Sequence, residues 1–173
     1  LGTPLQCCCG VHSADILAGN IGSRKRLKYG LLGDGINLTA RLKGLNRHYH
    51  TKTLVSDVVM ADAACEASFA VRPIDLVAVK GRQKGTQIYE VVGKSEEGDS
   101  KISSAVNLHT QAFHLYLQRD FAKAADAFNE AAKAFKEVGQ HDQASLILHQ
   151  RCNTYAQDPP PADWDGIERL KKK

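Results

Sequence analysis

The sequence lacks several features that would assign it to a class of protein at once. No apolar run approaches the ~18 residues that a membrane-spanning helix needs, and we expect no signal peptide in the residues before the first strand-like segment. The five cysteines form no Cys-x-x-Cys pair, so neither a disulfide framework nor a zinc site is predicted. We expect the cysteines, including the adjacent Cys7, Cys8 and Cys9, to be small buried hydrophobic residues in a reducing compartment.

A large net charge of one sign is also absent. The chain carries 23 Lys and Arg against 19 Asp and Glu, and the resulting charge of +4 is too small to indicate nucleic acid on its own. The basic excess lies in residues 1–60, which contain eight Lys or Arg and three Asp. Such an excess suits a small anionic ligand or a polyanion, and a solvated basic surface explains it equally well. Because the chain starts with Leu1 and not Met, we expect a fragment of a longer protein.

Hydrophobic periodicity predicts a first half that mixes strands and helices. Short strands are expected at 5–12, 27–32 and 51–56. Helices are expected at 35–47 and 57–66, and a glycine-marked turn at 18–23. The alternating segment 69–79, the turn at 81–85 and the segment 87–93 predict a β-hairpin. The pattern indicates an α/β or α+β layered structure built on one sheet.

The second half has a helical pattern. Residues 94–104, KSEEGDSKISS, are rich in Ser and charge and predict a linker. Beyond them, apolar residues recur every three or four positions and predict helices at 104–118, 120–138 and 141–156. We therefore expect a domain at 1–93, the linker, and a helical extension at 105–173 that ends in a proline-rich basic tail.

Part of this extension, residues 112–133, resembles a tetratricopeptide-type helical hairpin with Asp120 at its turn. One such hairpin cannot bury its apolar face alone. It must pack on the sheet domain, on a partner, or on the third helix. The single tryptophan, Trp164, is expected to anchor the tail to the helices.

One stretch, LKYGLLGDGINLTARLKGLN at 27–46, combines the features of a ligand site. A strand that we expect to be buried leads through three glycines into a helix, an arrangement that lets the backbone approach a ligand. Asn37 and Arg41 are four residues apart and share one helical face. No acidic residue lies four positions from Arg41, so its guanidinium is available for phosphate oxygens. A surface arginine and a capping asparagine would give the same pattern.

The segments on both sides of residues 27–46 add to the evidence for a ligand site. Four segments resemble, in their order and spacing, the C-terminal half of the class III nucleotide cyclase domain. They are VHSADILAGNIGS, LKYGLLGDGINLTARLKGLN, TLVSD and DLVAVKGRQKGTQIYEVVG. The resemblance covers about residues 5–93 and centres on G-D-x-[IV]-N-x-[AT]-[AS]-R-L. It implies an α+β fold: the C-terminal part of a ferredoxin-like cyclase domain, a mixed sheet with helices packed on it, followed here by an α-helical hairpin region. The run LILHQRCNTYAQDPPPADWDGI resembles the helical extension of some multidomain cyclases.

The resemblance also implies an activity and the residues that carry it. Class III cyclases form a cyclic nucleotide and pyrophosphate from ATP or GTP in intracellular signal transduction, and we favour cyclic AMP over cyclic GMP. Asn37 and Arg41 match the pair that steadies the ribose and the phosphorane-like transition state. Lys80 matches the lysine of the V-K-G turn, which contacts the phosphates. Gly30 occupies the purine-reading position, and Ala14 stands where the family usually has a glycine.

The cofactors and partners follow from the same resemblance. Two carboxylates that hold Mg²⁺ or Mn²⁺ would lie upstream of this chain, and Asp34 is expected only to cap a helix. The family pairs two domains head to tail, so the chain supplies the metal-free half of a dimer-interface site and is expected to be inactive alone. The expected partners are a second cyclase domain in a homodimer or pseudo-dimer, a nucleoside triphosphate and a protein bound by the helical tail, but no nucleic acid. We expect a cytoplasmic position, and the sequence leaves membrane anchoring of the parent protein open.

Other hypotheses stay open at this stage. A catalytically degenerate cyclase-like module for dimerisation or partner binding is favoured by Gly30 and Ala14, whereas Asn37, Arg41 and Lys80 favour the enzyme. A general phosphate-binding domain with a helical scaffold is a third hypothesis. The segment GRQKGT lacks the spacing of a P-loop, and His12 is expected to be structural.

Overall fold

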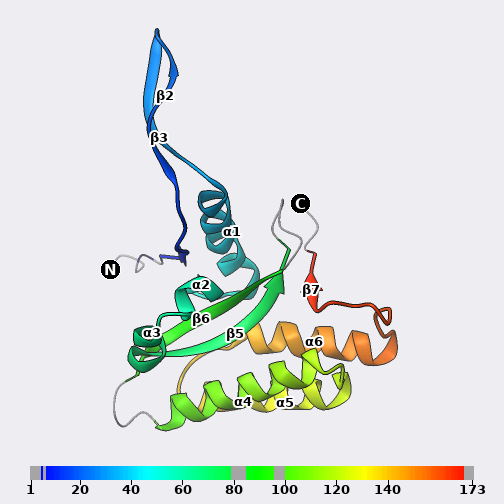
Figure 1. Cartoon of the computed structure of the whole chain (residues 1–173). Helices are drawn as coiled ribbons and strands as arrows, with labels where there is room; N and C mark the ends of the chain where they lie inside the picture. Colours follow the sequence, from blue (N-terminus) through cyan, green and yellow to red (C-terminus); the bar gives the residue numbers. More distant parts are fainter. Residues whose placement is uncertain (1–4, 6, 79–84, 96–99, 170–173) are drawn as a thin grey trace.

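The computed structural model describes residues 5, 7–78, 85–95 and 100–169 of the chain. The elements are β1 (Cys9–Val11), β2 (Leu17–Ser23), β3 (Arg26–Leu32), α1 (Asp34–Tyr49), β4 (Thr53–Ser56), α2 (Asp57–Met60), α3 (Ala63–Ser68), β5 (Phe69–Val77), β6 (Thr86–Lys94), α4 (Ser100–Leu117), α5 (Phe121–Glu137), α6 (Gln143–Gln157) and β7 (Ile167–Glu168). A mixed sheet and its helices are followed by a helical region, which confirms the predicted α+β class (Figure 1).

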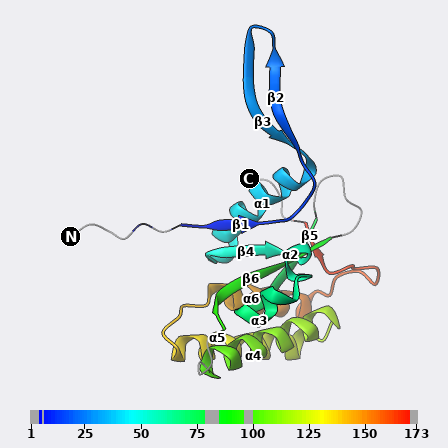
Figure 2. The ribbon, with the colours of Figure 1, turned by 60° about the vertical axis from the view of Figure 1, so that its left-hand side comes forward.

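The main sheet has the strand order β1-β4-β6-β5-β7. The two outer strands, β1 and β7, run parallel to their neighbours, and the inner pairs β4–β6 and β5–β6 are antiparallel. The predicted hairpin of 69–79 and 87–93 is present as β5 and β6, and most of its turn lies outside the described residues. Both ribbon views show α1 on one side of the sheet and α4, α5 and α6 on the other (Figures 1 and 2).

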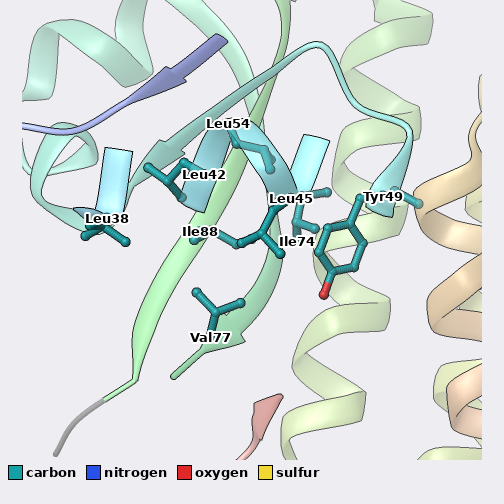
Figure 3. Packing of buried hydrophobic residues seen from close by; sticks show 9 residues of the cluster. Leu38, Leu42, Leu45, Tyr49, Leu54, Ile74, Val77 and Ile88 are labelled. Carbon is teal, nitrogen blue, oxygen red and sulfur yellow. The ribbon is translucent and has the colours of Figure 1, made fainter. Parts of the chain in front are cut away.

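The packing of α1 follows directly from its sequence. Its apolar residues recur every three or four positions and form one stripe that faces the sheet. The stripe residues are buried and meet side chains of β4, β5 and β6 (Figure 3), and the cluster consists of Leu38, Leu42, Leu45, Tyr49, Leu54, Ile74, Val77, Ile88 and Ala144. This packing fixes α1 on the sheet and thereby fixes the direction in which its opposite face points.

A close backbone contact also holds α1 against β1. A Cβ atom added at Gly10 would lie 2.6 Å from the backbone nitrogen of Lys43 and 2.7 Å from the carbonyl oxygen of Thr39. Near the other end of the contact, buried Asn46 donates a hydrogen bond to the carbonyl of Cys9 at 2.8 Å and accepts one from Thr51 at 2.9 Å. Only glycine lets β1 approach the helix this closely.

The substitution Gly10→Ala should therefore destabilise the chain by at least about 1–3 kcal/mol, because the atoms that the new methyl group meets belong to the backbone of α1. Gly44, in the middle of the same helix, provides a matched control, since a Cβ there would meet nothing within 4 Å. Gly44→Ala should stabilise the helix by about 0.5–1 kcal/mol. Urea unfolding of both variants measures the difference, and equal shifts would contradict the contact.

The hairpin of β2 and β3 corrects two predictions. Residues 18–23 are not a turn, because β2 pairs with β3 in a continuous register from Leu17 opposite Leu32 to Ser23 opposite Arg26. β3 is not buried either: the hairpin projects away from the main sheet (Figure 1). Its large exposed apolar side chains are Leu17, Ile21, Leu27, Tyr29, Leu31 and Leu32. An isolated two-stranded sheet of this kind is at most marginally stable in water, so this surface is suited to being covered.

The helical region agrees closely with the periodicity. Asp120 and Asp142 occupy the N-cap positions of α5 and α6 and accept hydrogen bonds from backbone N–H groups three residues on. Within the segment predicted as a linker, Lys94 still belongs to β6 and α4 already starts at Ser100. The helix predicted at 57–66 is divided into α2 and α3.

The aromatic cluster around Trp164 confirms the predicted anchor of the tail. The indole packs edge-on against Tyr116, Phe121 and Tyr155, with ring centroids 5.2, 5.6 and 5.9 Å away. The cysteines, in contrast, are only partly as predicted: Cys152 is buried, but Cys7, Cys8 and Cys9 are exposed.

A buried polar cluster joins the helices to the sheet; we call it the seam cluster, and it consists of Arg72, Glu90, His109, Asp142 and Ser145. The Arg72 guanidinium donates to Asp142 at 2.7 and 2.8 Å and to Glu90 at 2.6 and 2.8 Å. Its plane also lies over the ring of Phe135, 4.2 Å from the centroid. Strand β6 and helices α5 and α6 therefore all contact one arginine of β5.

His109 is fully buried within the seam cluster and is held as the neutral imidazole. Its Nε2–H donates to the carbonyl of Pro73 at 2.7 Å, which leaves Nδ1 to accept from the hydroxyl of Ser145 at 2.7 Å. Burial, and next the positive charge of Arg72, lower the pKa of His109 to about 3. For Asp142, burial is the largest single effect and would raise the pKa, but the hydrogen bonds and the positive charge of Arg72, with smaller contributions from His109 and Ser145, together outweigh it and hold the pKa below its usual value.

The lowered pKa of His109 predicts acid-sensitive stability. An unfolded histidine binds a proton below a pKa of about 6.5, whereas His109 in the native chain does so only near 3. Between these values the unfolded state binds more protons, so stability rises with pH and falls as the solution is acidified, by at most about 1.4 kcal/mol per pH unit for this residue. His109→Gln cannot titrate and should flatten the dependence of the urea midpoint on pH. If the urea midpoints of the wild type and of His109→Gln change equally with pH between about pH 5 and 6.5, the lowered pKa of His109 is contradicted.

Candidate active site

The candidate site begins where β3 passes into α1. Gly33 occupies the N-cap position with φ +150°, a conformation that residues with a side chain rarely adopt. Asp34 is the first residue of the helix and not its cap, so the expectation that it caps α1 is wrong. Its carboxylate lies in the first turn, where a negative charge interacts favourably with the helix dipole.

Asn37 and Arg41 lie one turn apart on α1, away from the buried leucine stripe. Asn37 is exposed and Arg41 is half-buried. Among the described residues, neither side chain forms a hydrogen bond or an ion pair, so the guanidinium charge of Arg41 is not neutralised by this part of the chain. The helix thus presents an amide and an unpaired cation side by side on a rigid element, a combination that suits an anionic, hydroxyl-bearing ligand.

A cavity of about 590 Å³ lies on another side of α1, next to β1. It is lined by Cys8, Cys9, Gly10, His12, Ala14, Ile16, Leu31, Gly35, Ile36, Thr39, Ala40 and Lys43, and neither Asn37 nor Arg41 is among them. Asn37 and Arg41 therefore do not line this cavity. A binding site that uses the pair needs a second surface to close it.

Ala14, which departs from the family pattern, fits without strain. Its φ is not positive, and a Cβ atom added at Gly35 would lie 2.6 Å from the Cβ of Ala14. The missing side chain of Gly35 therefore makes room for the methyl group of Ala14. The change at position 14 does not distort the start of the helix.

Gly30, the predicted purine-reading position, pairs with Gly19 in the middle of the hairpin. A Cβ atom at Gly30 would lie 2.9 Å from the Cδ1 atom of Ile21, so the tip of this isoleucine on the neighbouring strand lies beside position 30. The sequence pattern gave no sign of this contact, because it depends on the pairing of β2 with β3. An apolar side chain therefore lies beside the position where the resemblance predicts a purine-reading group.

Lys80, the predicted phosphate-binding residue, lies outside the described residues. The two strands that lead to it are described: β5 ends at Val77 and β6 begins at Thr86. The structure therefore brings Asn37 and Arg41 together on one helix, and leaves the position of Lys80 as a prediction.

The other described candidate residues, His12 and the possible metal ligands, show no arrangement that indicates a catalytic role. His12 shares a hydrogen bond with Ser56 at 2.7 Å, which links the ends of β1 and β4. In the described part of the chain, no group of three or more His, Cys, Asp or Glu side chains lies close enough to hold a metal ion. Across the same residues, we find no helix whose length and hydropathy would let it cross a bilayer.

Comparison with known proteins gives three relatives, although no protein-family model matches the chain. The chain is 38% identical over 84 residues to adenylate cyclase 1 of Rhizobium meliloti (strain 1021), and this match covers 49% of the chain and 12% of the relative. It is 27% identical over 145 residues to the terminal-differentiation-specific adenylate cyclase of Dictyostelium discoideum, covering 83% of the chain and 7% of the relative. It is also 34% identical over 83 residues to the adenylate cyclase of Anabaena cylindrica, covering 47% of the chain and 16% of the relative.

Two solved structures are similar over part of the chain. A bacterial light-regulated adenylyl cyclase aligns with a TM-score of 0.42 and 23% identity, over 59% of this chain and 28% of that one. The adenylyl cyclase CyaB from P. aeruginosa aligns with a TM-score of 0.39 and 27% identity, over 48% of this chain and 40% of that one.

The three sequence relatives, all adenylate cyclases, support a nucleotide cyclase domain, and the mixed sheet and the glycine-led helix agree with one. The chain is similar in sequence to part of these adenylate cyclases and spans between 7% and 16% of their length.

Proposed function

We propose that the parent protein is a class III purine nucleotide cyclase that forms cyclic AMP and pyrophosphate from ATP. The observation that carries the proposal is the free face of α1, where Asn37 and Arg41 stand one turn apart with no counter-charge among the described residues. The names of the three relatives, all adenylate cyclases, support ATP as the substrate over GTP.

In the proposed reaction the ribose 3′-oxygen attacks the α-phosphorus. A new P–O bond closes the ring, the bond to the β-phosphate oxygen breaks, pyrophosphate leaves, and the hydroxyl proton passes to solvent or to a base outside this chain. Negative charge accumulates on the phosphorane oxygens, where the Arg41 guanidinium stabilises it, while the Asn37 amide holds the ribose by hydrogen bonding. The packing of the leucine stripe keeps both groups in place before the reaction starts, which avoids the cost of ordering them.

We further propose that the active site is completed by a second cyclase domain. The Asn37–Arg41 face opens to solvent, and the hairpin of β2 and β3 exposes apolar side chains next to it in sequence. Carboxylates for Mg²⁺ or Mn²⁺ would come from residues outside this chain, since the described residues contain no such group. On this proposal the chain supplies the half of the site that binds the transition state, and it is inactive alone.

The deciding experiment assays the full-length parent protein with Mn²⁺ and either ATP or GTP. Release of cyclic AMP with pyrophosphate is the expected result, and release of cyclic GMP would correct the base preference. If the parent protein forms neither product but still self-associates, the proposal is wrong, and the second candidate function described below is the better one.

That second candidate is a degenerate cyclase-like module that pairs with another domain or binds a partner. Gly30 favours it, because a glycine has no side chain with which to read a purine and the apolar tip of Ile21 lies beside it. The unpaired Arg41 favours the enzyme, because a cation held on a rigid helix suits the negative charge that develops on a phosphorane.

A further inference from the structure

The hairpin of β2 and β3 carries its charge at one end, which we call the hairpin tip, residues 21–29. The cations of the tip are Arg24, Lys25, Arg26 and Lys28, and no Asp or Glu occurs anywhere in residues 16–33. All four residues are exposed, and none of them forms an ion pair with another described residue. The tip therefore concentrates positive charge that the described part of the chain does not neutralise.

The backbone of the turn fixes these cations at the far end of the hairpin. Ser23 pairs with Arg26, so Arg24 and Lys25 form the connection between the two strands. Gly22 has φ +140°, and a Cβ atom there would collide with the carbonyl oxygen of Arg26, so glycine is needed to close the turn. Both ribbon views show the tip as the part of the hairpin farthest from the main sheet (Figures 1 and 2). The tip can therefore reach a surface that the body of the domain does not touch.

The two faces of the hairpin differ in chemistry. Because side chains alternate along a strand, Leu27, Tyr29 and Leu31 lie on one face, and Arg26 and Lys28 lie on the other. The three apolar side chains are 64%, 69% and 50% exposed, and the residues that pair with them on β2 are uncharged. The hairpin thus presents an exposed apolar face on one side, and cations on the other side and at the turn.

This combination matches the surface of a membrane that contains anionic lipids. Lys and Arg side chains bind the phosphate and carboxylate groups of such lipids, and apolar and aromatic side chains enter the boundary between the head groups and the acyl chains. A nucleic acid would also attract the cations, but the phosphates that dominate its surface offer no apolar partner for Leu27. The exposed apolar face therefore favours a lipid surface over a nucleic acid.

We propose that the hairpin tip is a docking site for a membrane surface that contains anionic lipids. The cations of the tip attract the head groups, and Leu27 and Tyr29 enter the interface. The inference goes beyond the proposed cyclase function and does not depend on it, and its test needs neither nucleotide nor activity. It is compatible with pairing to a second cyclase domain, because exposed Leu17 and Leu32 at the base of the hairpin lie outside the tip.

The first experiment measures sedimentation of the chain with lipid vesicles. One set of vesicles contains phosphatidylcholine and phosphatidylserine in equal amounts, and the other contains phosphatidylcholine alone. The chain should bind the mixed vesicles but not the neutral ones, and added salt should release it, because exposed charges are screened. Equal binding to both sets, or binding to neither, would overturn the proposal.

Removal of the tip charges locates the binding site. Arg24→Gln, Lys25→Gln, Arg26→Gln and Lys28→Gln together should weaken binding to the mixed vesicles by at least about a hundredfold, since each cation near an anionic surface contributes about fivefold. The matched control removes the same charge from exposed lysines of α4 and α5, and it consists of Lys101→Gln, Lys123→Gln, Lys133→Gln and Lys136→Gln. The control should bind within a few-fold of wild type. Equal losses in the two variants would show that only net charge matters, which contradicts a site at the tip.

The apolar face distinguishes a membrane from other polyanions. Leu27→Ala should weaken binding to the mixed vesicles by roughly tenfold, because its side chain enters the interface. Leu5→Ala removes the same atoms from a leucine that is 97% exposed outside the hairpin, and it should have no effect. If Leu27→Ala binds as tightly as the wild type, the proposal is wrong. It is also wrong if the chain binds duplex RNA through the tip cations but does not bind the mixed vesicles, because the tip is then a nucleic-acid site.

Hydrogen exchange provides a readout at the hairpin itself. A two-stranded sheet is marginally stable on its own, so the amides of β2 and β3 should exchange quickly in the free chain. Mixed vesicles should slow their exchange and leave that of α5 unchanged, because binding orders the hairpin. Sedimentation with the mixed vesicles but unchanged exchange in β2 and β3 would show that another part of the chain binds lipid, and would overturn the proposal.

Discussion

Arg41→Ala in the parent protein should lower kcat/KM for cyclic nucleotide formation by roughly two orders of magnitude, the usual cost of removing one group that stabilises transition-state charge. The guanidinium is unpaired among the described residues, so its removal breaks no ion pair there and should leave folding intact. The loss should appear mainly in kcat, because the charge on the phosphorane is greatest in the transition state. Arg41→Lys should recover only part of the activity, since an ammonium group cannot bind two oxygens in the same plane.

The same helix provides the control for this experiment. Arg47 is exposed, basic and six residues further along α1, so Arg47→Ala removes the same charge from the same element. Its activity should stay within a few-fold of wild type. If Arg41→Ala also stays within a few-fold, or if both variants lose activity equally, Arg41 does not act on the transition state, and the second candidate function becomes the better description.

The largest expected loss of stability concerns the seam cluster. Arg72→Met keeps most of the side-chain volume and removes the charge, which leaves the carboxylates of Glu90 and Asp142 buried without their cation. Removing one partner of a buried ionic cluster typically costs about 3–5 kcal/mol. Side-chain exposures of 5% for Arg72, 13% for Glu90 and 1% for Asp142 show that solvent cannot replace the lost contacts. Urea unfolding of the chain measures this loss.

An exposed ion pair on α5 gives the matched control. Lys133 and Glu130 are paired at 2.7 Å, as closely as Arg72 and Asp142, but their side chains are 60% and 59% exposed. Lys133→Met should not change stability measurably, because water solvates the remaining carboxylate. A small effect of Arg72→Met, comparable to that of Lys133→Met, would show that the seam cluster does not hold the helices on the sheet.

Local patterns in the sequence predicted most of the fold. The leucine stripe of α1, the alternation of β5 and β6 and the periodicity of α4, α5 and α6 are properties of neighbouring residues, and each was confirmed. β2 was missed because AGNIGS has the composition of a turn, and only its pairing with β3 makes it a strand. β7 has two residues and no pattern of its own, so nothing local could have revealed it.

The candidate site likewise has features that local sequence patterns predicted and features that depend on contacts between distant segments. The spacing of Asn37 and Arg41 was enough to place them on one face of a helix, and α1 confirms that arrangement. The seam cluster was not predictable, because its residues are scattered over β5, β6, α4 and α6 and meet only in the folded chain. The contact of Ile21 with the space beside Gly30 was missed for the same reason. The metal-binding half of the site and the position of Lys80 stay predictions.

The short strand β7 has a consequence for the way the protein is made. It is synthesised after every other described element, yet it pairs with the last two residues of β5, Leu76 and Val77. While the ribosome is still producing α4, α5 and α6, the backbone groups at this end of β5 lack that partner and can pair with a strand of another nascent chain. Translation that stalls or stops before β7 should therefore yield chains that a chaperone must hold, although every other described strand of the sheet is already complete.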